Sequence, residues 1–442
     1  MTGTKYSKWT KWGVFGAATL GYALFYVCRL SLNVVKKPIV DAGYLTEAQL
    51  GVIGSALFFS YAIGKFVNGF LADRVNVRYL MAGGLLIASL VNFALGFAIP
   101  FWAFAILWGL NGWVQSVGGP CSVISLNRWF DDRQRGTVYG FWSASHNIGE
   151  ALTFILTSFV VGALGWQWGF RSAACLGAVG VVLIFTFLKG APGQALTEPR
   201  TTQDECSETA QEPHEGQAPQ ESRASQASVN RKQLEVLKNP LIWALALASA
   251  FMYIARYAVN SWGVYYLEAH KGYTLEAAGS LIAVSSVCGV VGTVFSGLIS
   301  DKFFHSDRNI PAFIFSLMNL LSLLLFLFGP RDCYWLDIAS MILFGISIGV
   351  LICFLGGLMA VDLAPKEATG AALGVIGVSS YMAAGLQDIV SGALIETGKT
   401  IVDGATVYDF HQIRIFWTAA AAISLLLLGL IVLRTGKKQL NK

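Results

Sequence analysis

The 442-residue sequence has few charged residues: Asp, Glu, Lys and Arg make up 13% of it, about half of what a typical soluble protein carries. Hydrophobic residues make up 55%, and the mean hydropathy is +0.58. A chain with so little charge cannot cover the surface of the two or three soluble domains that its length would otherwise suggest. The composition therefore excludes an ordinary soluble protein and predicts a polytopic membrane protein.

Motifs for metal binding and catalysis are also missing. The seven cysteines are scattered, none forms a CxxC pair, and most fall inside apolar segments, which excludes a disulfide framework and a zinc site. HExxH and P-loop motifs are absent. We therefore expect neither an enzyme nor a bound cofactor or metal.

Long apolar runs, by contrast, are abundant. Runs of about 18 to 28 residues recur in both halves of the chain, each long enough to cross about 30 Å of hydrocarbon as a helix. The alternation of an outer-membrane barrel is absent, so no β-sheet is expected. The sequence predicts an all-α membrane protein with twelve transmembrane helices, near residues 12–35, 48–72, 79–98, 101–127, 137–162, 170–188, 241–267, 275–299, 311–329, 336–361, 370–395 and 413–434.

Lysine and arginine are distributed unevenly between the two sides of the membrane. With the N-terminus in the cytoplasm, most of the 31 Lys and Arg residues fall on the cytoplasmic side, as the positive-inside rule requires. An even number of crossings then places both termini in the cytoplasm. We expect the protein to lie in the plasma membrane, which would be the inner membrane of a bacterium. The formal charge of +5 reflects this bias, so it implies no nucleic-acid partner.

A polar stretch divides the apolar runs into two sets of six. Residues 190–238 are rich in Gln, Glu, Ser, Thr and Pro, a composition that cannot bury enough apolar surface to order itself. We expect a cytoplasmic central loop here, between an N-terminal six-helix half, 1–189, and a C-terminal six-helix half, 239–442. The end of the loop, RKQLEVLK, is a candidate interfacial helix.

The two halves repeat a polar triplet. The stretch FYVCRLSLN at 25–33 recurs as MYIARYAVN at 252–260, with Tyr, Arg and Asn at the same spacing. The repeat places Arg29 and Arg256 at matching depths in their apolar segments. It indicates an internal duplication of the kind found in transporters.

A second repeated motif ends the second and eighth spans, as GFLADR and GLISDK. Glycine lets helices approach closely, and the aspartate can sit at the positive N-terminal end of a neighbouring helix when the cytoplasmic side is closed. With twelve spans and a central loop, the motif resembles the signature of the major facilitator superfamily. On this resemblance, we expect Asp73, Arg74 and Asp301 to act in conformational gating.

Cations inside the spans outnumber acids: Arg29, Lys65 and Arg256, with His146 as a further candidate, against Glu150 and Asp388. A charge at the centre of a span costs about 2.5–3.5 kcal/mol, so these cations require partners. Pairing with membrane carboxylates is one explanation, but too few carboxylates are present. Arginine donates parallel hydrogen bonds to tetrahedral anions, so the pair Arg29 and Arg256 predicts a phosphate held between the halves.

Tyrosines share a helical face with each arginine. Tyr22 and Tyr26 precede Arg29, and Tyr253 precedes Arg256, at helical spacing. Such tyrosines often only pack, but a buried hydroxyl beside an arginine needs a hydrogen-bond partner. They are therefore candidates for contact with a substrate.

Several stretches, among them GYALFYVCR, LNGWVQSVGGPCSVISLNRWF and RGTVYGFWSASHNIGEAL, resemble the organophosphate:inorganic phosphate antiporters. This major facilitator family includes glycerol-3-phosphate, hexose-phosphate and phosphoglycerate transporters. The resemblance implies exchange of an external organophosphate for inorganic phosphate by alternating access, in a chain that needs no partner subunit. It implies that the following residues line the substrate site: Arg29, Arg256, Lys65, His146, Tyr26 and Tyr253. Tyr22, by its spacing from Arg29, and Asn147, which adjoins His146, are further candidates for substrate binding.

Two of these assignments have plain alternatives, because Lys65 lies close enough to the cytoplasmic end to snorkel and His146 would suit an ordinary core. The sequence also departs from the family, which commonly has Lys and Asp where Leu30 and Ser261 stand. Losing both members of an ion pair is cheaper than losing one. Substrate preference is therefore open.

The two intramembrane acids are a further departure from the family. Glu150 and Asp388 either neutralise Lys65 or an arginine, or act in substrate selectivity or proton uptake. Two other functions stay open for the whole chain. One is a membrane sensor of external sugar phosphate, which the family also contains. The other is a proton-coupled sugar symporter, which the twin arginines disfavour.

Overall fold

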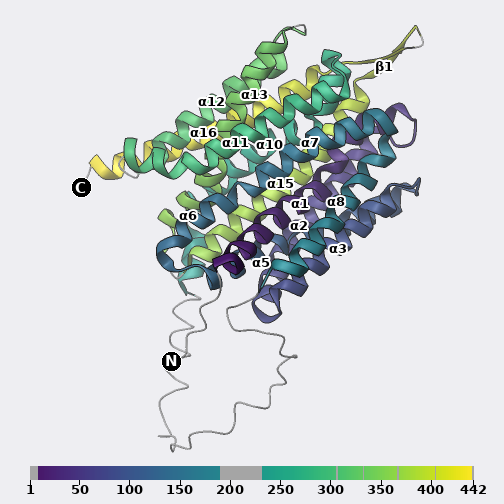
Figure 1. Cartoon of the computed structure of the whole chain (residues 1–442). Helices are drawn as coiled ribbons and strands as arrows, with labels where there is room; N and C mark the ends of the chain where they lie inside the picture. Colours follow the sequence, from purple (N-terminus) through teal and green to yellow (C-terminus); the bar gives the residue numbers. More distant parts are fainter. Residues whose placement is uncertain are drawn as a thin grey trace, which may run out of the picture.

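The computed structural model describes residues 8–189, 231–304, 307–331, 333–365, 368–403 and 405–440. Almost all of these residues lie in helices that run side by side, so that the start of the first helix and the end of the last lie at the same end of the bundle (Figure 1). We call this the termini end. A short β-hairpin lies at the opposite end, the hairpin end (Figure 1).

The N half consists of α1 (Lys8–Asp41), α2 (Glu47–Arg74), α3 (Val77–Leu95), α4 (Phe101–Gln115), α5 (Gly118–Trp129), α6 (Asp132–Ser143), α7 (Ser145–Leu164) and α8 (Trp166–Phe187). The C half consists of α10 (Pro240–Lys271), α11 (Leu275–Phe303), α12 (Asn309–Phe328), α13 (Tyr334–Cys353), η1 (Phe354–Leu358), α14 (Met359–Leu363), α15 (Thr369–Thr397) and α16 (His411–Leu440). Residues 231–238 also form a helix, where a helix was expected, and 190–230 of the expected central loop lie outside the described residues.

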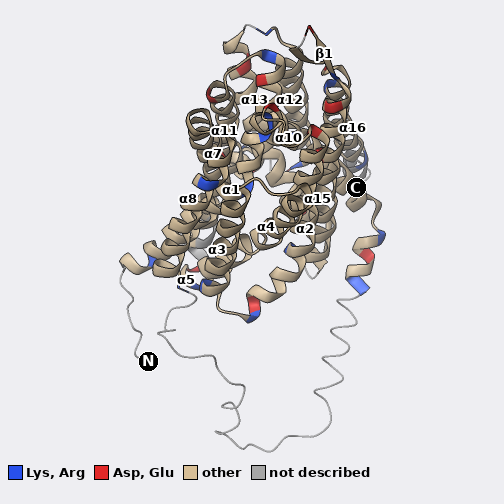
Figure 2. Cartoon of the chain, turned by 90° about the vertical axis from the view of Figure 1, so that its right-hand side faces the viewer, with Lys and Arg blue, Asp and Glu red and all other residues tan. Residues whose placement is uncertain are grey.

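Eleven helical segments of the described chain are long and apolar enough to cross a membrane, and they match eleven of the expected spans. The one remaining expected span, 101–127, which is the fourth in chain order, is divided between α4 and α5 by a turn at Ser116 and Val117. Its two parts are each too short to cross alone. Most charged residues lie toward the two ends of the bundle and few interrupt its middle (Figure 2). The twelve-helix membrane fold is therefore as predicted.

The duplication extends to how equivalent helices begin. Thr46 caps α2 by accepting a hydrogen bond from the Gln49 amide, and Thr274 caps α11 by accepting one from the Ala277 amide, both at 3.3 Å. Capping satisfies a backbone donor that the first turn leaves without a partner. The second helix of each half thus starts at a defined residue at the hairpin end.

Glycines bring the two halves into close contact. A Cβ atom on Gly54 of α2 would lie 1.9 Å from Oδ2 of Asp388 on α15, and one on Gly279 of α11 would lie 1.9 Å from Oγ of Ser158 on α7. Neither space admits a side chain, so α2 packs on α15 and α7 packs on α11 at backbone distance. These two contacts place polar residues of both halves on a shared central surface.

A two-stranded antiparallel sheet, β1 (Lys399–Val402) and β2 (Ala405–Tyr408), joins α15 to α16. The expectation of no β-sheet is wrong for this connection. Its signal is present in the sequence as KTIV-DG-ATVY, an Asp-Gly pair between alternating residues. Asp403 has a φ of +49°, the left-handed conformation that such a tight turn requires.

Candidate functional site

Arg29 and Arg256 meet at one tyrosine. Arg29 lies near the middle of α1 and Arg256 near the middle of α10, and both side chains are buried. Arg29 donates a hydrogen bond of 3.4 Å to the hydroxyl of Tyr257, and the guanidinium carbon of Arg256 lies 5.3 Å from the centre of the same ring. The structure thus brings the two predicted arginines together between the halves.

Aromatic rings surround the Arg29 guanidinium. Its central carbon lies 4.3 Å from the ring centre of Tyr61, 5.4 Å from that of Tyr26 and 5.6 Å from that of Tyr381. Each cation–π contact contributes about 0.5–2 kcal/mol when desolvated, which stabilises the cation without neutralising it. The sequence analysis missed Tyr61 and Tyr381. A signal for Tyr61 exists, because it lies one helical turn before Lys65.

The other buried cations have carboxylate partners. The buried Lys and Arg residues of the described chain are Arg29, Lys36, Arg256 and Lys271. Three buried ion pairs join Lys36 to Asp388 at 3.3 Å, Arg256 to Glu150 at 2.8 Å, and Lys271 to Asp337. Within the described residues, Arg29 is the buried cation that has no carboxylate within 4.0 Å.

The predicted excess of buried positive charge is therefore real but smaller than expected. The sequence analysis left out Lys36, Lys271 and Asp337, which lie near the ends of their helices but are buried. It also placed Lys65 among the buried cations, whereas this side chain is exposed. Glu150 and Asp388 were the two intramembrane acids of the sequence analysis. Glu150 neutralises Arg256, which agrees with the alternative that an acid pairs with an arginine.

Asp388 neutralises Lys36, which the sequence analysis had not considered as its partner. Ser261 lies within this pair: its hydroxyl accepts a 2.7 Å hydrogen bond from Lys36 and donates one of 2.6 Å to Asp388. The indole of Trp262 donates to the same carboxylate oxygen at 2.7 Å. The sequence lacks the family's ion pair at Leu30 and Ser261. In the structure, Lys36 of α1 and Asp388 of α15 form an ion pair beside Ser261 instead.

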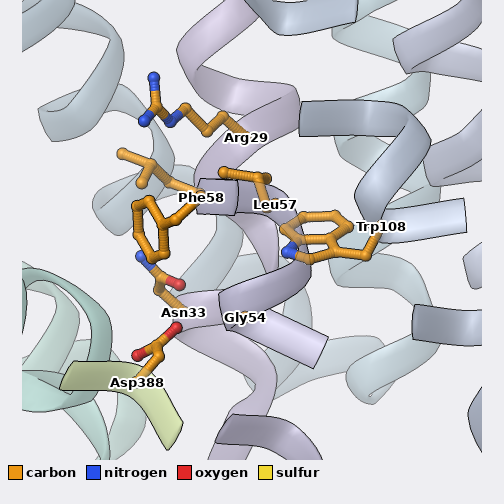
Figure 3. A pocket seen from close by; sticks show the side chains of 8 residues that line it. Arg29, Asn33, Gly54, Leu57, Phe58, Trp108 and Asp388 are labelled. Atoms are coloured by element: carbon orange, nitrogen blue, oxygen red, sulfur yellow. The ribbon is translucent and has the colours of Figure 1, made fainter. Parts of the chain in front are cut away.

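A narrow recess of about 10 Å³, room for about one water molecule, separates Arg29 from this ion pair (Figure 3). It is lined by Arg29, Leu30, Asn33, Gly54, Leu57, Phe58, Trp108 and Asp388. In Figure 3 the Arg29 side chain points away from Asp388, and Asn33 lies between them. Asp388 is therefore directed at Lys36 and leaves the Arg29 guanidinium free toward the tyrosines.

A second recess, of about 20 Å³, lies beside Arg256. It is lined by Asn147, Glu150, Arg256, Asn260, Ser285, Ser286, Gly289, Phe344, Gly345 and Ile348. Glu150 binds Arg256 through Oε1, while its Oε2 accepts hydrogen bonds from Asn260 at 3.2 Å and from Ser286 at 3.5 Å. This recess is formed mainly by polar groups from α7, α10 and α11.

The remaining predicted site residues lie around the arginines. The Lys65 ammonium lies 5.6 Å from the Tyr381 ring centre, so Lys65 faces α15 of the other half rather than only the membrane. The Tyr26 ring packs against both His146, at 5.8 Å between ring centres, and Tyr22, at 5.4 Å. Tyr253 meets Tyr381 edge-on at 5.5 Å.

Asn147 also joins the two halves at this site. It donates a 3.4 Å hydrogen bond to Thr293 of α11. The predicted substrate residues are therefore close together in space.

Polar contacts close the site toward the hairpin end. Beyond the Lys36 and Asp388 pair, Glu47 at the start of α2 accepts hydrogen bonds from Tyr265 at 2.9 Å, Tyr408 at 2.8 Å and Lys399 at 3.3 Å. Burial raises the pKa of Tyr408 above its usual value, so its hydroxyl stays protonated and keeps donating to the carboxylate.

The predicted gating residues lie at the termini end. Asp73 and Arg74, at the end of α2, and Asp301, in the last turn of α11, are all exposed. They are far along their helices from the hairpin contacts. Their role in gating remains a prediction.

The family model described as Major Facilitator Superfamily matches residues 18–387. A membrane sensor protein UhpC of Salmonella typhimurium is 33% identical over 375 residues, which cover 83% of this chain and 81% of that protein. A probable hexose phosphate transport protein of Chlamydia trachomatis is 32% identical over 434 residues, 96% of this chain and 91% of that one.

Solved structures also share the fold. A bacterial homologue of the human lysosomal transporter Spinster superimposes with a TM-score of 0.71 over 97% of this chain and 96% of that chain, at 16% sequence identity. At this identity the likeness concerns the path of the backbone alone.

Proposed function

The chain belongs to the major facilitator superfamily, in its organophosphate transporter family, and from this premise we propose that it exchanges an external organophosphate for inorganic phosphate by alternating access. The observation that carries the proposal is the state of Arg29. It is buried, ringed by tyrosines and without a carboxylate, while Lys36, Arg256 and Lys271 each have one. A cation kept in this way requires an anion from outside the chain.

Phosphate suits the groups around Arg29. The guanidinium offers parallel donors to two phosphate oxygens, and its Nε has no hydrogen-bond partner in the structure. The rings of Tyr26, Tyr61 and Tyr381 surround it, and a tyrosine hydroxyl can donate a further hydrogen bond. The Lys65 ammonium lies 5.6 Å from the centre of the Tyr381 ring. Arg29 is therefore the primary anchor in our proposal, with Lys65 as a second positive charge.

Arg256 takes a different part from Arg29. Its charge is matched by Glu150 at 2.8 Å, so it contributes hydrogen bonds rather than net attraction while that pair persists. It still flanks Tyr257 together with Arg29. We propose that it orients the bound phosphate compound across the boundary between the halves.

Rocking of the two halves around this site would give access from one side at a time. The hydrogen bonds of Glu47 and the Lys36 and Asp388 pair close the hairpin end in this structure. With the termini in the cytoplasm of a bacterial cell, as the lysine and arginine distribution favours, this is a state closed to the outside. Breaking these contacts would accompany the outward-facing state.

The test is exchange in proteoliposomes. Vesicles that contain the purified protein and unlabelled phosphate are expected to take up labelled phosphate, and external sugar phosphate is expected to inhibit the uptake. Empty vesicles loaded in the same way are the control. Absence of exchange by folded protein would contradict the proposal.

A sensor is the second candidate, because a relative at 33% identity is named a membrane sensor protein. A sensor needs the same phosphate site but not its turnover. It would bind sugar phosphate in detergent and show little or no exchange in vesicles. Binding and exchange measured on one preparation therefore separate the two functions.

A further inference from the structure

We infer that Asn92 of α3 and Asn111 of α4 are positioning residues for Arg29, because they hold the turn of α1 that carries it through the backbone carbonyl of Cys28. Both amides reach the backbone of α1, so they would act on a bound anion only through Arg29. The inference rests on the proposed function in one respect, since it takes Arg29 as the anchor of the phosphate. It adds to that proposal how the anchor is kept in place without a carboxylate.

Two side-chain amides converge on the Cys28 carbonyl. The Nδ2 atoms of Asn92 and Asn111 each donate a hydrogen bond of 2.9 Å to it, from two different helices. Both asparagines are fully buried. Inside a membrane bundle, water does not replace a lost hydrogen bond of this kind. The Cys28 carbonyl is therefore fixed by two neighbouring helices of the N half.

This carbonyl belongs to the same peptide group as the backbone nitrogen and Cα atom of Arg29. A peptide group is planar, so fixing the Cys28 oxygen also fixes the point from which the Arg29 side chain starts. Ser31 adds a second attachment, because its hydroxyl donates a 2.8 Å hydrogen bond to Oδ1 of Asn92. Asn92 thus holds α1 on both sides of Arg29 along the chain.

Both amides are themselves held by hydrogen bonds. Asn92 also donates to the Ala88 carbonyl of its own helix at 2.9 Å, and Oδ1 of Asn111 accepts a hydrogen bond of 3.2 Å from Gln115. An amide with partners on both its oxygen and its nitrogen cannot flip without losing them. The network therefore ties α1 to α3 and α4 in a defined geometry.

The two arginines of the repeat are thus held in different ways. Glu150 binds the Arg256 side chain directly, at 2.8 Å. A carboxylate beside Arg29 would hold it too, but would offset the charge that attracts phosphate. Hydrogen bonds to the Cys28 carbonyl leave that charge unmatched and the side chain directed at Tyr257 of the C half. The cation is held ready for an anion, which lowers the cost of binding one.

Binding of inorganic phosphate to the purified protein in detergent tests the inference. The dissociation constant, measured by isothermal titration calorimetry, does not depend on how much of the preparation is folded, so it separates positioning from lost stability. We expect Asn92→Ala and Asn111→Ala each to raise it about three- to tenfold, the effect of about one hydrogen bond. An unchanged constant in both variants would overturn the inference.

A buried asparagine of the C half provides the matched control. Asn319 of α12 donates a 3.3 Å hydrogen bond to Ser347 of α13. Asn319→Ala also removes a buried amide between two helices, so its thermal unfolding midpoint is expected to fall as that of Asn92→Ala does. Its dissociation constant for phosphate is expected to stay at the wild-type value. An equal rise in Asn319→Ala and Asn92→Ala would indicate a general loss of packing and overturn the inference.

Ser31→Ala is a milder variant that keeps the test possible if neither asparagine variant folds. It removes only the hydroxyl that joins α1 to Asn92. We expect the dissociation constant of phosphate to rise about two- to threefold, the lower end of the range for one hydrogen bond. Ser347→Ala is its control and is expected to bind phosphate as the wild type does. A wild-type constant in Ser31→Ala would then overturn the inference.

Arg29→Lys, measured in the same way, separates this inference from the proposed function. If Arg29→Lys binds phosphate more weakly and the asparagine variants do not, the positioning role is contradicted and the anchor stands. If Arg29→Lys binds as the wild type does, or if the wild type binds no phosphate, the anchor and the positioning role are both contradicted. Weaker binding in all three variants, by a protein that exchanges no phosphate, contradicts the transport proposal alone.

Discussion

At the scale of single residues, the two arginines of the repeat are not equivalent. The repeated Tyr, Arg and Asn spacing correctly predicted that Arg29 and Arg256 occupy matching positions and converge. It could not predict which of them faces Glu150, because that depends on how α7 is rotated against α10. The carboxylate divides their roles, so that Arg29 alone remains free to attract an anion.

Replacing Arg29 tests its role as anchor. In Arg29→Lys we expect phosphate exchange to fall about ten- to a hundredfold, because lysine keeps the charge but loses the planar pair of donors. Arg171→Lys is the matched control, since Arg171 donates to the Gly96 carbonyl away from the site. Exchange rates normalised to protein amount provide the measurement, and near-normal exchange in Arg29→Lys would remove it from the site.

The two arginines should also differ in their effect on stability. Replacing Arg256 is expected to lower the free energy of unfolding more than replacing Arg29. Arg256→Gln leaves Glu150 buried and unmatched, which is expected to cost about 3–5 kcal/mol, whereas Arg29→Gln strands no carboxylate. Thermal unfolding in detergent without ligand is the measurement. We expect a lower midpoint for Arg256→Gln than for Arg29→Gln. The reverse order would mean that Arg29 has an ionic partner.

At the scale of elements, the last turns of α1 differ from the predicted first span in a way that changes the assignment of the partner of Asp388. Hydropathy ended the first span at residue 35, but α1 continues to Asp41 and packs those turns against the C half. Lys36 is therefore buried, and it supplies the partner for Asp388 that the sequence analysis sought among Lys65 and the arginines. A hydropathy window reports how apolar a segment is, and not whether a lysine at its edge meets water or another helix.

The Lys36 and Asp388 pair should behave as a unit. Lys36→Met or Asp388→Leu alone leaves a buried charge unmatched and is expected to lower stability, while the double variant recovers most of the loss. Thermal unfolding of the four proteins gives the coupling. Strictly additive losses would show that the two residues do not interact.

The Lys271 and Asp337 pair serves as the control for that experiment. It lies within the C half, between α10 and α13. Its double variant Lys271→Met, Asp337→Leu should also recover stability. Of these two double variants, only that of Lys36 and Asp388 should favour opening of the hairpin end, because Lys36 and Asp388 belong to different halves whereas Lys271 and Asp337 belong to one.

The hairpin end offers a second test of closure. Glu47→Ala removes three hydrogen bonds between α2 and the C half. Spin labels at Ala42 and Ile401, in a variant without native cysteines, would report the distance across that end. We expect a shift of the population toward longer distances in Glu47→Ala, and none in Asp409→Asn, whose carboxylate accepts a hydrogen bond from the nearby His411 amide. Unchanged distances in both would show that Glu47 does not hold this end closed.

At the scale of the whole molecule, the sequence predicted the number of spans and their near-duplication but not their irregularities. The apolar run at 101–127 hides the break between α4 and α5, and the run ending α13 hides the turn of η1. Apolarity sets which segments enter the membrane, while local packing sets where a helix breaks. The hairpin was missed because its Asp-Gly signal was outweighed by the composition of the surrounding chain.

The distribution of charge over the whole molecule also bears on whether the substrate is phosphorylated or is a neutral sugar carried with protons. A symporter would need an acid at the centre of the N half, and Glu150 does lie there, but it is matched by Arg256. Arg29 remains as an unmatched positive charge, which a neutral sugar would not neutralise. The distribution of charge around the centre thus favours a phosphorylated substrate.

Uptake of labelled glucose 6-phosphate into proteoliposomes tests this account most directly. Wild-type protein and Arg29→Lys would be compared in vesicles with and without internal phosphate, in the absence of a proton gradient. We predict uptake by the wild type only when phosphate is inside, and at least about tenfold less uptake by Arg29→Lys. Uptake without internal phosphate, or undiminished uptake by Arg29→Lys, would contradict exchange at an arginine-anchored site.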